Sequence, residues 1–225
     1  MMTRLLTIAL VLILSVPLAE AQSVEKGRIS FGILGGVNFQ NLTGQDHSGD
    51  KLANDLMTGY HAGFNVQIPI GPEFYLQPGL LYSLKGAKNT SGALTSTTKV
   101  SYIEMPLNLV YKGRLGNGFV MLGLGPYIGY GIGGKMITTG GEVTVETDVT
   151  FQNSVALTDP LLDTYYKKFD AGGNLFAGYE MASGLFFQLN TQLGMLKVNP
   201  ENAWFPNDEA SIKHTGFGLS LGYRF

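Results

Sequence analysis

The side chains best suited to acid–base chemistry are three histidines, His47, His61 and His214, which lie far apart in the chain. A hydrolytic set of His61, Ser83 and Glu104 is conceivable, because a histidine can act as base for a serine while a carboxylate orients it. However, no recognisable motif joins these residues. We therefore interpret His61 as a polar interior residue and predict that the protein is not an enzyme.

The sequence also gives no indication of metal, phosphate or thiol chemistry. The three histidines lack the spacing of metal ligands, and no G-x-x-x-x-G-K-[ST] phosphate loop is present. The chain has no cysteine, which excludes disulfides, thiolate metal sites and thiol nucleophiles. A formal net charge of −2 does not favour nucleic acid as a partner. We expect no metal, no other cofactor and no nucleic-acid partner.

Charged residues are rare in the segments with strand periodicity, and most of them share the face that carries Gly, Ser, Asn and Gln. Buried charges must be paired and hydrogen-bonded. We therefore expect a polar network with a structural role inside the molecule, with Glu104 paired to Lys85 or Lys168. Its predicted members are Lys85, Glu104, Lys168, Asp170, Glu180 and Arg224.

The elements that position these residues follow the pattern of the final segment, HTGFGLSLGYRF, at 214–225. Apolar residues alternate with small or polar ones, which is typical of a strand with one apolar face. A strand of about ten such residues suits a tilted bilayer crossing. The segment resembles the C-terminal strand of bacterial outer-membrane barrels, and this resemblance implies an assembly signal at Tyr223 and Phe225.

Strand-like segments recur along the chain, and the connections between them alternate in length. The short connections are 71–73, 112–118 and 181–184, whereas 40–57, 87–98, 133–167 and 197–213 are long and polar. This pattern predicts an all-β fold, an eight-stranded antiparallel up-and-down transmembrane barrel with short periplasmic turns and long extracellular loops. The predicted strands are 29–39, 58–70, 74–86, 99–111, 119–132, 168–180, 185–196 and 214–225.

The long segment 133–167 has further local signals. Residues 135–145 predict a hairpin, with its turn at Gly140-Gly141, that extends above the membrane. Thr158-Asp159-Pro160 followed by Leu161-Leu162 predicts a helix start, because it combines a capping residue with an early proline.

The scarcity of charge indicates which strand face points outward. A water-facing exterior would be about 25–35% charged, so the apolar face is predicted to contact lipid. The other face would fill a lumen too narrow for an ion path, since eight strands leave room only for side chains. Aromatic residues near the short-turn end predict an interfacial girdle. They are Phe31, Phe74, Tyr111, Phe119, Tyr179, Phe187, Tyr223 and Phe225.

The N-terminal segment 1–21 reads as a secretory signal peptide. Arg4 supplies the positive region, 5–16 the apolar region and Ala19-Glu20-Ala21 the cleavage site. The alternative is a membrane anchor, but the apolar run is short for a helical span. We expect a mature chain that starts at Gln22 and forms one barrel domain, 22–225, in the outer membrane.

Several stretches resemble the PorT-like outer-membrane β-barrel family of Bacteroidota. They include FGILGGVNFQNL at 31–42, LLYSLKGA at 80–87, YIEMPLNLVY at 102–111 and FDAGGNLFAGYE at 169–180, with GPY at 125–127 in a further strand. The resemblance implies an integral outer-membrane barrel in the cell envelope. Some members of that family belong to a secretion and gliding apparatus.

These observations favour a non-enzymatic outer-membrane barrel with a structural or binding role exerted through its outer loops. Two alternatives stay open, namely a component of a protein-secretion or gliding assembly, and a lipid-modifying barrel enzyme. The expected partners are outer-membrane lipid, the barrel assembly machinery during insertion, and other envelope proteins.

Overall fold

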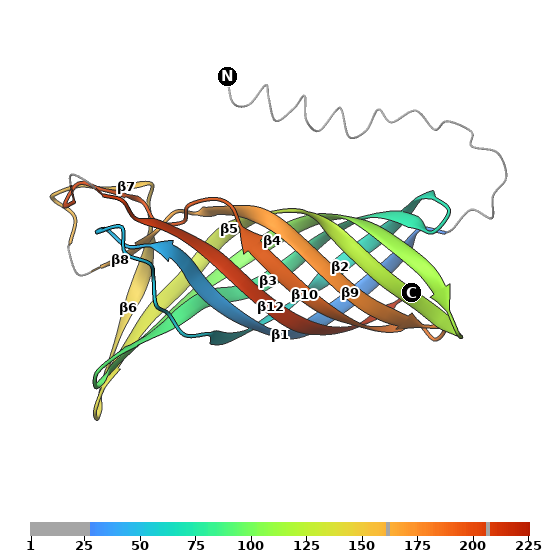
Figure 1. Cartoon of the computed structure of the whole chain (residues 1–225), viewed down its shortest axis with the longest axis horizontal. Coiled ribbons are helices and arrows are strands. Elements are labelled where there is room, and N and C mark those ends of the chain that lie inside the picture. Colours follow the sequence, from blue (N-terminus) through green and yellow to red (C-terminus); the bar gives the residue numbers. More distant parts are fainter. Residues whose placement is uncertain (1–27, 161–162, 206–207) are drawn as a thin grey trace, which may run out of the picture.

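The structure is a computed structural model that describes residues 28–160, 163–205 and 208–225. Eight long strands make up most of it (Figure 1). They are β1 (Ser30–Gln45), β2 (Met57–Gly71), β3 (Phe74–Ser91), β4 (Leu94–Leu115), β5 (Gly118–Gly140), β9 (Phe169–Met181), β10 (Leu185–Gly194) and β12 (Ser211–Arg224). Four shorter strands are β6 (Val143–Phe151), β7 (Ser154–Val155), β8 (Thr164–Tyr166) and β11 (Glu201–Asn202).

The eight long strands close into a ring. Each pairs antiparallel with its neighbour in the order β1, β2, β3, β4, β5, β9, β10, β12, and β12 pairs back onto β1. Each of the eight predicted strand segments overlaps one strand of this ring. Every connection joins strands that are neighbours in the ring, as expected for an up-and-down arrangement.

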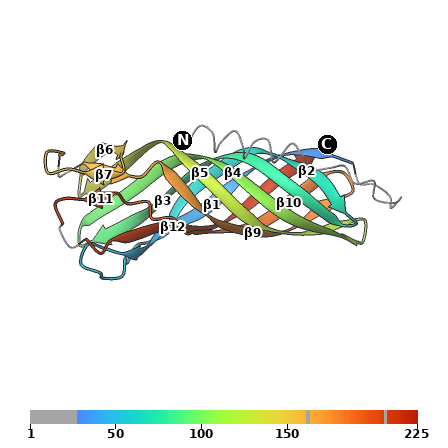
Figure 2. The same cartoon turned by 90° about the horizontal axis from the view of Figure 1, so that it is seen from above.

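One end of the ring carries short turns and the other carries the long connections. The short strands β6, β7 and β11 gather at the second end, and the chain terminates at the first (Figure 2). β5 and β6 form the predicted hairpin, with Gly141 in the turn at a φ of 61° that favours glycine. The hairpin prediction is therefore confirmed.

Two predicted connections are shorter than expected. β3 and β4 stay paired as far as Ser91↔Leu94, so segment 87–98 is mostly strand. Only a tight turn containing Gly92 remains between the two strands. Its threonines are β-branched and favour this extended conformation. Likewise β4 continues to Leu115, so the predicted turn 112–118 contracts to the residues around Gly116.

The predicted helix start at Thr158-Asp159-Pro160 is not found, and the described ranges contain no helix. Asp159 accepts a hydrogen bond from the backbone N–H of Ala156, which precedes it, and another from Gln152. A helix cap would instead accept from N–H groups that follow it, so Asp159 closes a turn. Leu161 and Leu162 lie outside the described residues, as does the predicted signal peptide.

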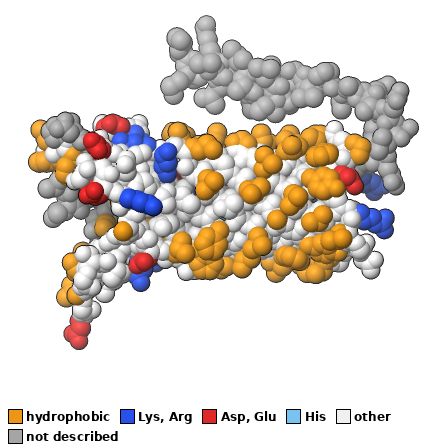
Figure 3. All heavy atoms as spheres, viewed as in Figure 1, with side chains coloured by type: hydrophobic (Ala, Val, Ile, Leu, Met, Phe, Trp, Pro, Cys, Tyr) orange, Lys and Arg blue, Asp and Glu red, His pale blue; other side chains and the backbone are white. Residues whose placement is uncertain are grey.

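The two strand faces differ as the alternation predicted. Outward side chains are apolar, such as Leu107 at 45% exposure, whereas Asn38, Gln67 and Glu104 are buried within the ring. Figure 3 shows apolar side chains covering the ring between charged groups at its two ends. No helix in the described part of the chain is long and apolar enough to span a membrane.

Aromatic residues lie near the short-turn end, with one exception to the predicted girdle. Phe31, Phe74, Phe187 and Phe225 are exposed on the outer surface. Phe119 instead shares the inward parity of buried Met121, and its ring lies 4.9 Å from the Lys112 ammonium. Phe119 is therefore an interior residue, and the prediction that it belongs to the outer girdle was wrong.

Candidate functional site: the polar interior

A buried lysine connects three strands across the interior. Lys85 of β3 donates to Asp170 Oδ2 of β9 at 2.9 Å and also contacts Glu104 Oε1 of β4. All three side chains are at most 1% exposed. The Tyr127 hydroxyl donates to Asp170 Oδ2 at 3.2 Å, and the Tyr127 ring lies 4.3 Å from the Lys85 ammonium. One cation thus serves two carboxylates in the half of the lumen nearer the long connections.

A second charged group lies at the short-turn end. Arg224 donates to Glu180 Oε2 at 2.9 Å and to Asn65 Oδ1 at 3.0 Å. Lys112 reaches the other oxygen of Glu180 at 2.6 Å. Lys112 was missed in the sequence because 112–118 was interpreted as a turn. Continuing the inward parity of Glu104 along β4 would have identified it.

Lys168 does not belong to either group. It is exposed, and its ammonium lies 3.3 Å from the Tyr130 hydroxyl. The chain bends at Lys168, where its carbonyl accepts a hydrogen bond from Gly131. The alternation that buries Asp170 therefore does not extend back to Lys168. The prediction of a lumen-facing Lys168 paired with Glu104 was wrong, and Gln192 occupies the second oxygen of Glu104 at 3.0 Å.

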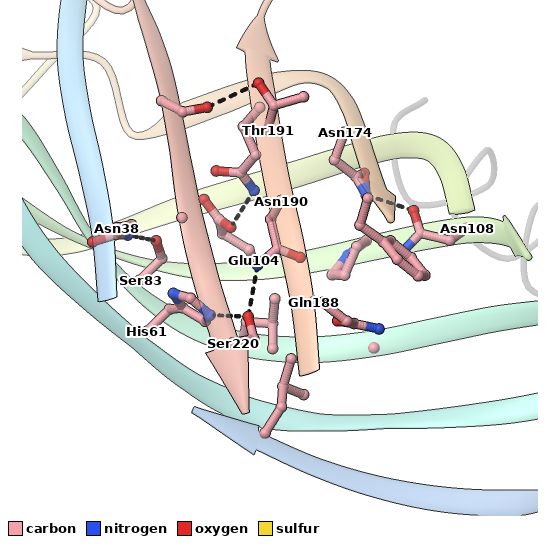
Figure 4. Close-up of a pocket in the computed structure, with 18 of the residues that line it drawn as sticks. Asn38, His61, Ser83, Glu104, Asn108, Asn174, Gln188, Asn190, Thr191 and Ser220 are labelled. Carbon is pink, nitrogen blue, oxygen red and sulfur yellow. Dashed lines mark hydrogen bonds between the residues drawn. The ribbon is translucent and has the colours of Figure 1, made fainter. Parts of the chain in front are cut away.

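His61, Ser83 and Glu104, the hydrolytic set considered from the sequence, line one cavity, and His61 lies opposite Ser83 on the paired strands β2 and β3, but no hydrogen bond joins them. His61 Nε2 lies 2.7 Å from Ser220 Oγ on β12, while Ser83 accepts a hydrogen bond from Asn38 (Figure 4). Asn190 also donates to the Ser220 oxygen at 2.6 Å. Ser83 and His61 therefore have separate partners.

The other two histidines are held by partners of their own. His214 Nε2 lies 3.2 Å from the Tyr102 hydroxyl in the interior, and His47 lies in the connection between β1 and β2. Among the described residues, no cluster of three or more His, Cys, Asp and Glu could hold a metal ion.

Between the two charged groups lies a cavity of about 80 Å³, whose lining includes nine Asn and Gln side chains beside apolar ones. Its volume corresponds to roughly five water molecules. The carboxamides partly bond one another, as where Asn174 donates to Asn108 (Figure 4). Other buried amide atoms in the lining have no hydrogen-bond partner within the described residues. These are Asn38 Oδ1, Gln40 Oε1, Asn174 Oδ1 and Gln188 Nε2.

The end with the long connections is held together by its own contacts. β7 and β11 pair across two connections, and His47 stacks on Phe205 with ring centroids 4.0 Å apart. His47 Nδ1 also lies 2.8 Å from Asp208 Oδ1. Burial acts to raise the pKa of Asp208, but the Ala210 N–H and His47 outweigh it and hold that pKa below its usual range.

The last residues close the ring at the opposite end. The backbone N–H of Phe225 donates to the Phe31 carbonyl at 2.8 Å, and its ring packs edge-on against Tyr223 at 4.9 Å. Both rings are exposed on the outer surface. The assembly role that the sequence resemblance implied for them stays a prediction.

The comparisons with known proteins identify a family and only weak structural likenesses. A family model described as "Outer membrane protein beta-barrel domain" matches residues 20–198. No curated protein matches the chain.

The solved structures that resemble the chain include two of Ail, the attachment invasion locus protein of Yersinia pestis. One of them is in complex with the heparin analogue sucrose octasulfate. They share 12% and 11% identity at TM-scores of 0.41 and 0.38, covering 88% of this chain and 100% of Ail. OccK5 (OpdH) of Pseudomonas aeruginosa shares 11% identity over 91% of this chain and 99% of its own, at a TM-score of 0.13. At these TM-scores the likenesses carry no argument about function.

Proposed function

Because the chain belongs to the outer membrane protein beta-barrel domain family, we propose that it is an integral outer-membrane barrel that binds at its extracellular end. Residues 1–21 direct export and are removed, and the barrel assembly machinery inserts the domain with its short turns facing the periplasm. The apolar outer surface of the ring supports insertion into lipid. Within the family, the stretches around 31–42 and 102–111 favour a PorT-like member of Bacteroidota.

The interior supports a barrel that is not a channel. Lys85, Glu104 and Asp170 meet across the lumen, and the Arg224 group fills it nearer the periplasm. A ring of eight strands leaves little room beyond such side chains. Ser220 accepts a hydrogen bond from Asn190 as well as contacting His61, which supports a structural interior rather than a catalytic one.

The binding role is supported by the ordered structure of the extracellular end, where the long connections lie. β3, β4, β5 and β6 continue as paired strands beyond the interior groups, so this end presents a sheet of defined shape. Its surface exposes the apolar side chains of Leu94, Val143 and Val145, and Glu146, which pairs with Lys135, follows Val145 in the sequence. Exposed apolar groups on an ordered surface are typical of protein contact sites. Envelope proteins are the partners that this surface fits.

Co-purification in mild detergent tests this proposal. A variant in which residues 137–147 are replaced by a short Gly-Ser turn should lose the envelope proteins that accompany the intact chain. In a matched control, the same Gly-Ser sequence replaces Gly116-Asn117 in a short turn. This variant should retain the envelope proteins. If both variants retain the same partners, the outer end is not the binding surface. Retention of secretion components in that experiment would favour a role in a secretion assembly instead.

A further inference from the structure

The outermost strand of the sheet at the extracellular end has an edge without a partner. Residues 143–148 of β6 pair with 135–140 of β5, and this hairpin projects away from the ring (Figure 1). On its other side β6 pairs with β8 only at 149–151. Within the described part of the chain, no backbone group is hydrogen-bonded to that side of 143–148. β6 also lacks the proline, lysine or bulge that commonly shields an exposed edge.

The turn before β6 identifies the backbone groups that point to this open edge. A two-residue turn with Gly141 at a φ of 61° joins β5 to β6. In such a turn the carbonyl before it accepts a hydrogen bond from the N–H after it, and the direction of the backbone groups then alternates along the strand. The residues whose N–H and C=O groups point to the open edge are therefore Thr144, Glu146 and Asp148.

Apolar and acidic side chains alternate along the open edge. Val143 and Val145 are 65% and 55% exposed and share one face of the strand, whereas Glu146 and Asp148 share the other. Lys135 contacts Glu146 at 3.0 Å. Among the described residues no cation forms an ion pair with Asp148. The edge thus offers an apolar strip on one face and uncompensated negative charge on the other.

The acidic side chains disfavour a second copy of this chain as the occupant. In a two-fold symmetric antiparallel pairing of two β6 strands, residues that lie opposite each other share one face. Each register centred on a residue from 144 to 147 therefore sets two carboxylates opposite each other, contributed by Glu142, Glu146 or Asp148. Like charges directly opposite each other destabilise a strand pair, and opposite charges stabilise it. The edge therefore fits a basic strand.

We propose that the open edge of β6 binds an extended, basic segment of an envelope protein, which adds to the sheet as a further strand. Main-chain hydrogen bonds to Thr144, Glu146 and Asp148 hold the segment. Its side chains alternate, with apolar ones beside Val143 and Val145 and lysine or arginine beside the carboxylates. This inference rests on the binding role proposed for the extracellular end, and it specifies the partner and the mode of binding.

Disulfide cross-linking to a synthetic peptide tests the edge directly, because the chain has no cysteine of its own. The probe is a short peptide that alternates valine and lysine, with a cysteine in place of one lysine. Thr144→Cys places a thiol on the edge strand. Thr139→Cys is the matched control on β5, since the two hydroxyls lie 3.2 Å apart on the same face. Thr144→Cys should cross-link roughly tenfold faster than Thr139→Cys, because binding raises the local concentration of the peptide thiol. A peptide that alternates valine and glutamate should show no such preference.

A proline on the edge separates strand addition from simple attraction between charges. Thr144→Pro removes an edge N–H and keeps every charge, and proline is tolerated where the N–H points away from the partner strand. Thr90→Pro is the matched control at the opposite edge of the same sheet, where Lys88 directs its N–H to the Asp55 carbonyl. In detergent, a fluorescent valine–lysine peptide should bind the Thr144→Pro chain roughly tenfold more weakly than the unmodified chain, a difference of about 1.4 kcal/mol. Thr90→Pro should leave the affinity unchanged.

Different results would overturn different parts of the proposal. Equal cross-linking of Thr144→Cys and Thr139→Cys, or equal affinity of the Thr144→Pro and unmodified chains, would overturn strand addition. Equal binding of the glutamate peptide would overturn the basic class of partner. A dimer of the unmodified chain that Thr144→Pro dissociates would show that a second copy occupies the edge. If Thr144→Pro retains envelope proteins that the replacement of 137–147 removes, the extracellular end binds them by another surface, and the proposed function stands while this inference fails.

Discussion

Removing the shared cation should destabilise the barrel more than removing either of its partners. In Lys85→Met, Glu104 and Asp170 both stay buried and lose their cation. Breaking a buried ion pair from one side typically costs about 3–5 kcal/mol. In contrast, Glu104→Ala leaves Lys85 bonded to Asp170 at 2.9 Å. Its expected cost is nearer that of one charged hydrogen bond, about 1.5–3 kcal/mol.

The double variant Lys85→Met/Glu104→Ala provides the sharper test. It measures the interaction free energy between the two positions rather than the stability lost through one substitution. With Lys85 already changed to Met, Glu104 is an uncompensated buried carboxylate, so Glu104→Ala should then cost little or recover stability. The coupling free energy between the two positions should reach about 2 kcal/mol, which lies within the range for residues in direct contact. The outward control Leu107→Ala should cost less than about 1 kcal/mol, because lipid can fill the space that it leaves.

Urea unfolding in lipid vesicles gives these free energies by linear extrapolation, with circular dichroism as the probe of the folded ring. An unfolding midpoint for Lys85→Met equal to that of the unmodified chain would refute the reasoning. Additive effects of Lys85→Met and Glu104→Ala would show that the two charges do not act as a pair.

Three further outcomes are expected. Lys168→Met should change the free energy of unfolding by less than about 0.5 kcal/mol, since Lys168 is exposed; a loss of several kcal/mol would return it to the interior network. Deleting Phe225 should lower the amount of barrel in the outer membrane without lowering the stability of refolded protein, and unchanged insertion would argue against an assembly signal. Because its pKa is depressed, Asp208 stabilises the outer loops above the ordinary aspartate pKa of about 3.9 and loses this effect as pH falls below it. The fluorescence of Trp204, the single tryptophan, should therefore change only in acid. The Asp208→Ala variant should show the acid spectrum at pH 7. A pH-independent spectrum in the unmodified chain would contradict this.

The ring strands and their faces could be predicted because one rule governs them throughout. Each strand alternates between a lipid-compatible face and a face of small or amide side chains, so period two locates both the element and its orientation. Errors arose where that rule stops. Lys168 lies at a bend, and Lys112 begins a run of glycines and charges that favours a turn but continues as strand.

Contacts across the lumen were only partly predictable. Lys85 and Glu104 lie on neighbouring strands, so their heights along the barrel suggested the pair. The contact of His61 with Ser220 depends instead on how β12 closes against β1, which local sequence does not specify. The same is true of Asp170, which reaches Lys85 from across the ring.

Planar-bilayer recording of the purified, unmodified protein tests the central claim most directly. If the paired charges close the lumen and the function lies at the outer end, the inserted protein should give no stable conductance steps at any holding potential that the bilayer tolerates. Insertion should be verified in the same bilayer by protease cleavage of the outer loops added from one side. Reproducible porin-like steps from verified insertions would contradict the account, because they would require an open path through the interior around Lys85 and Arg224.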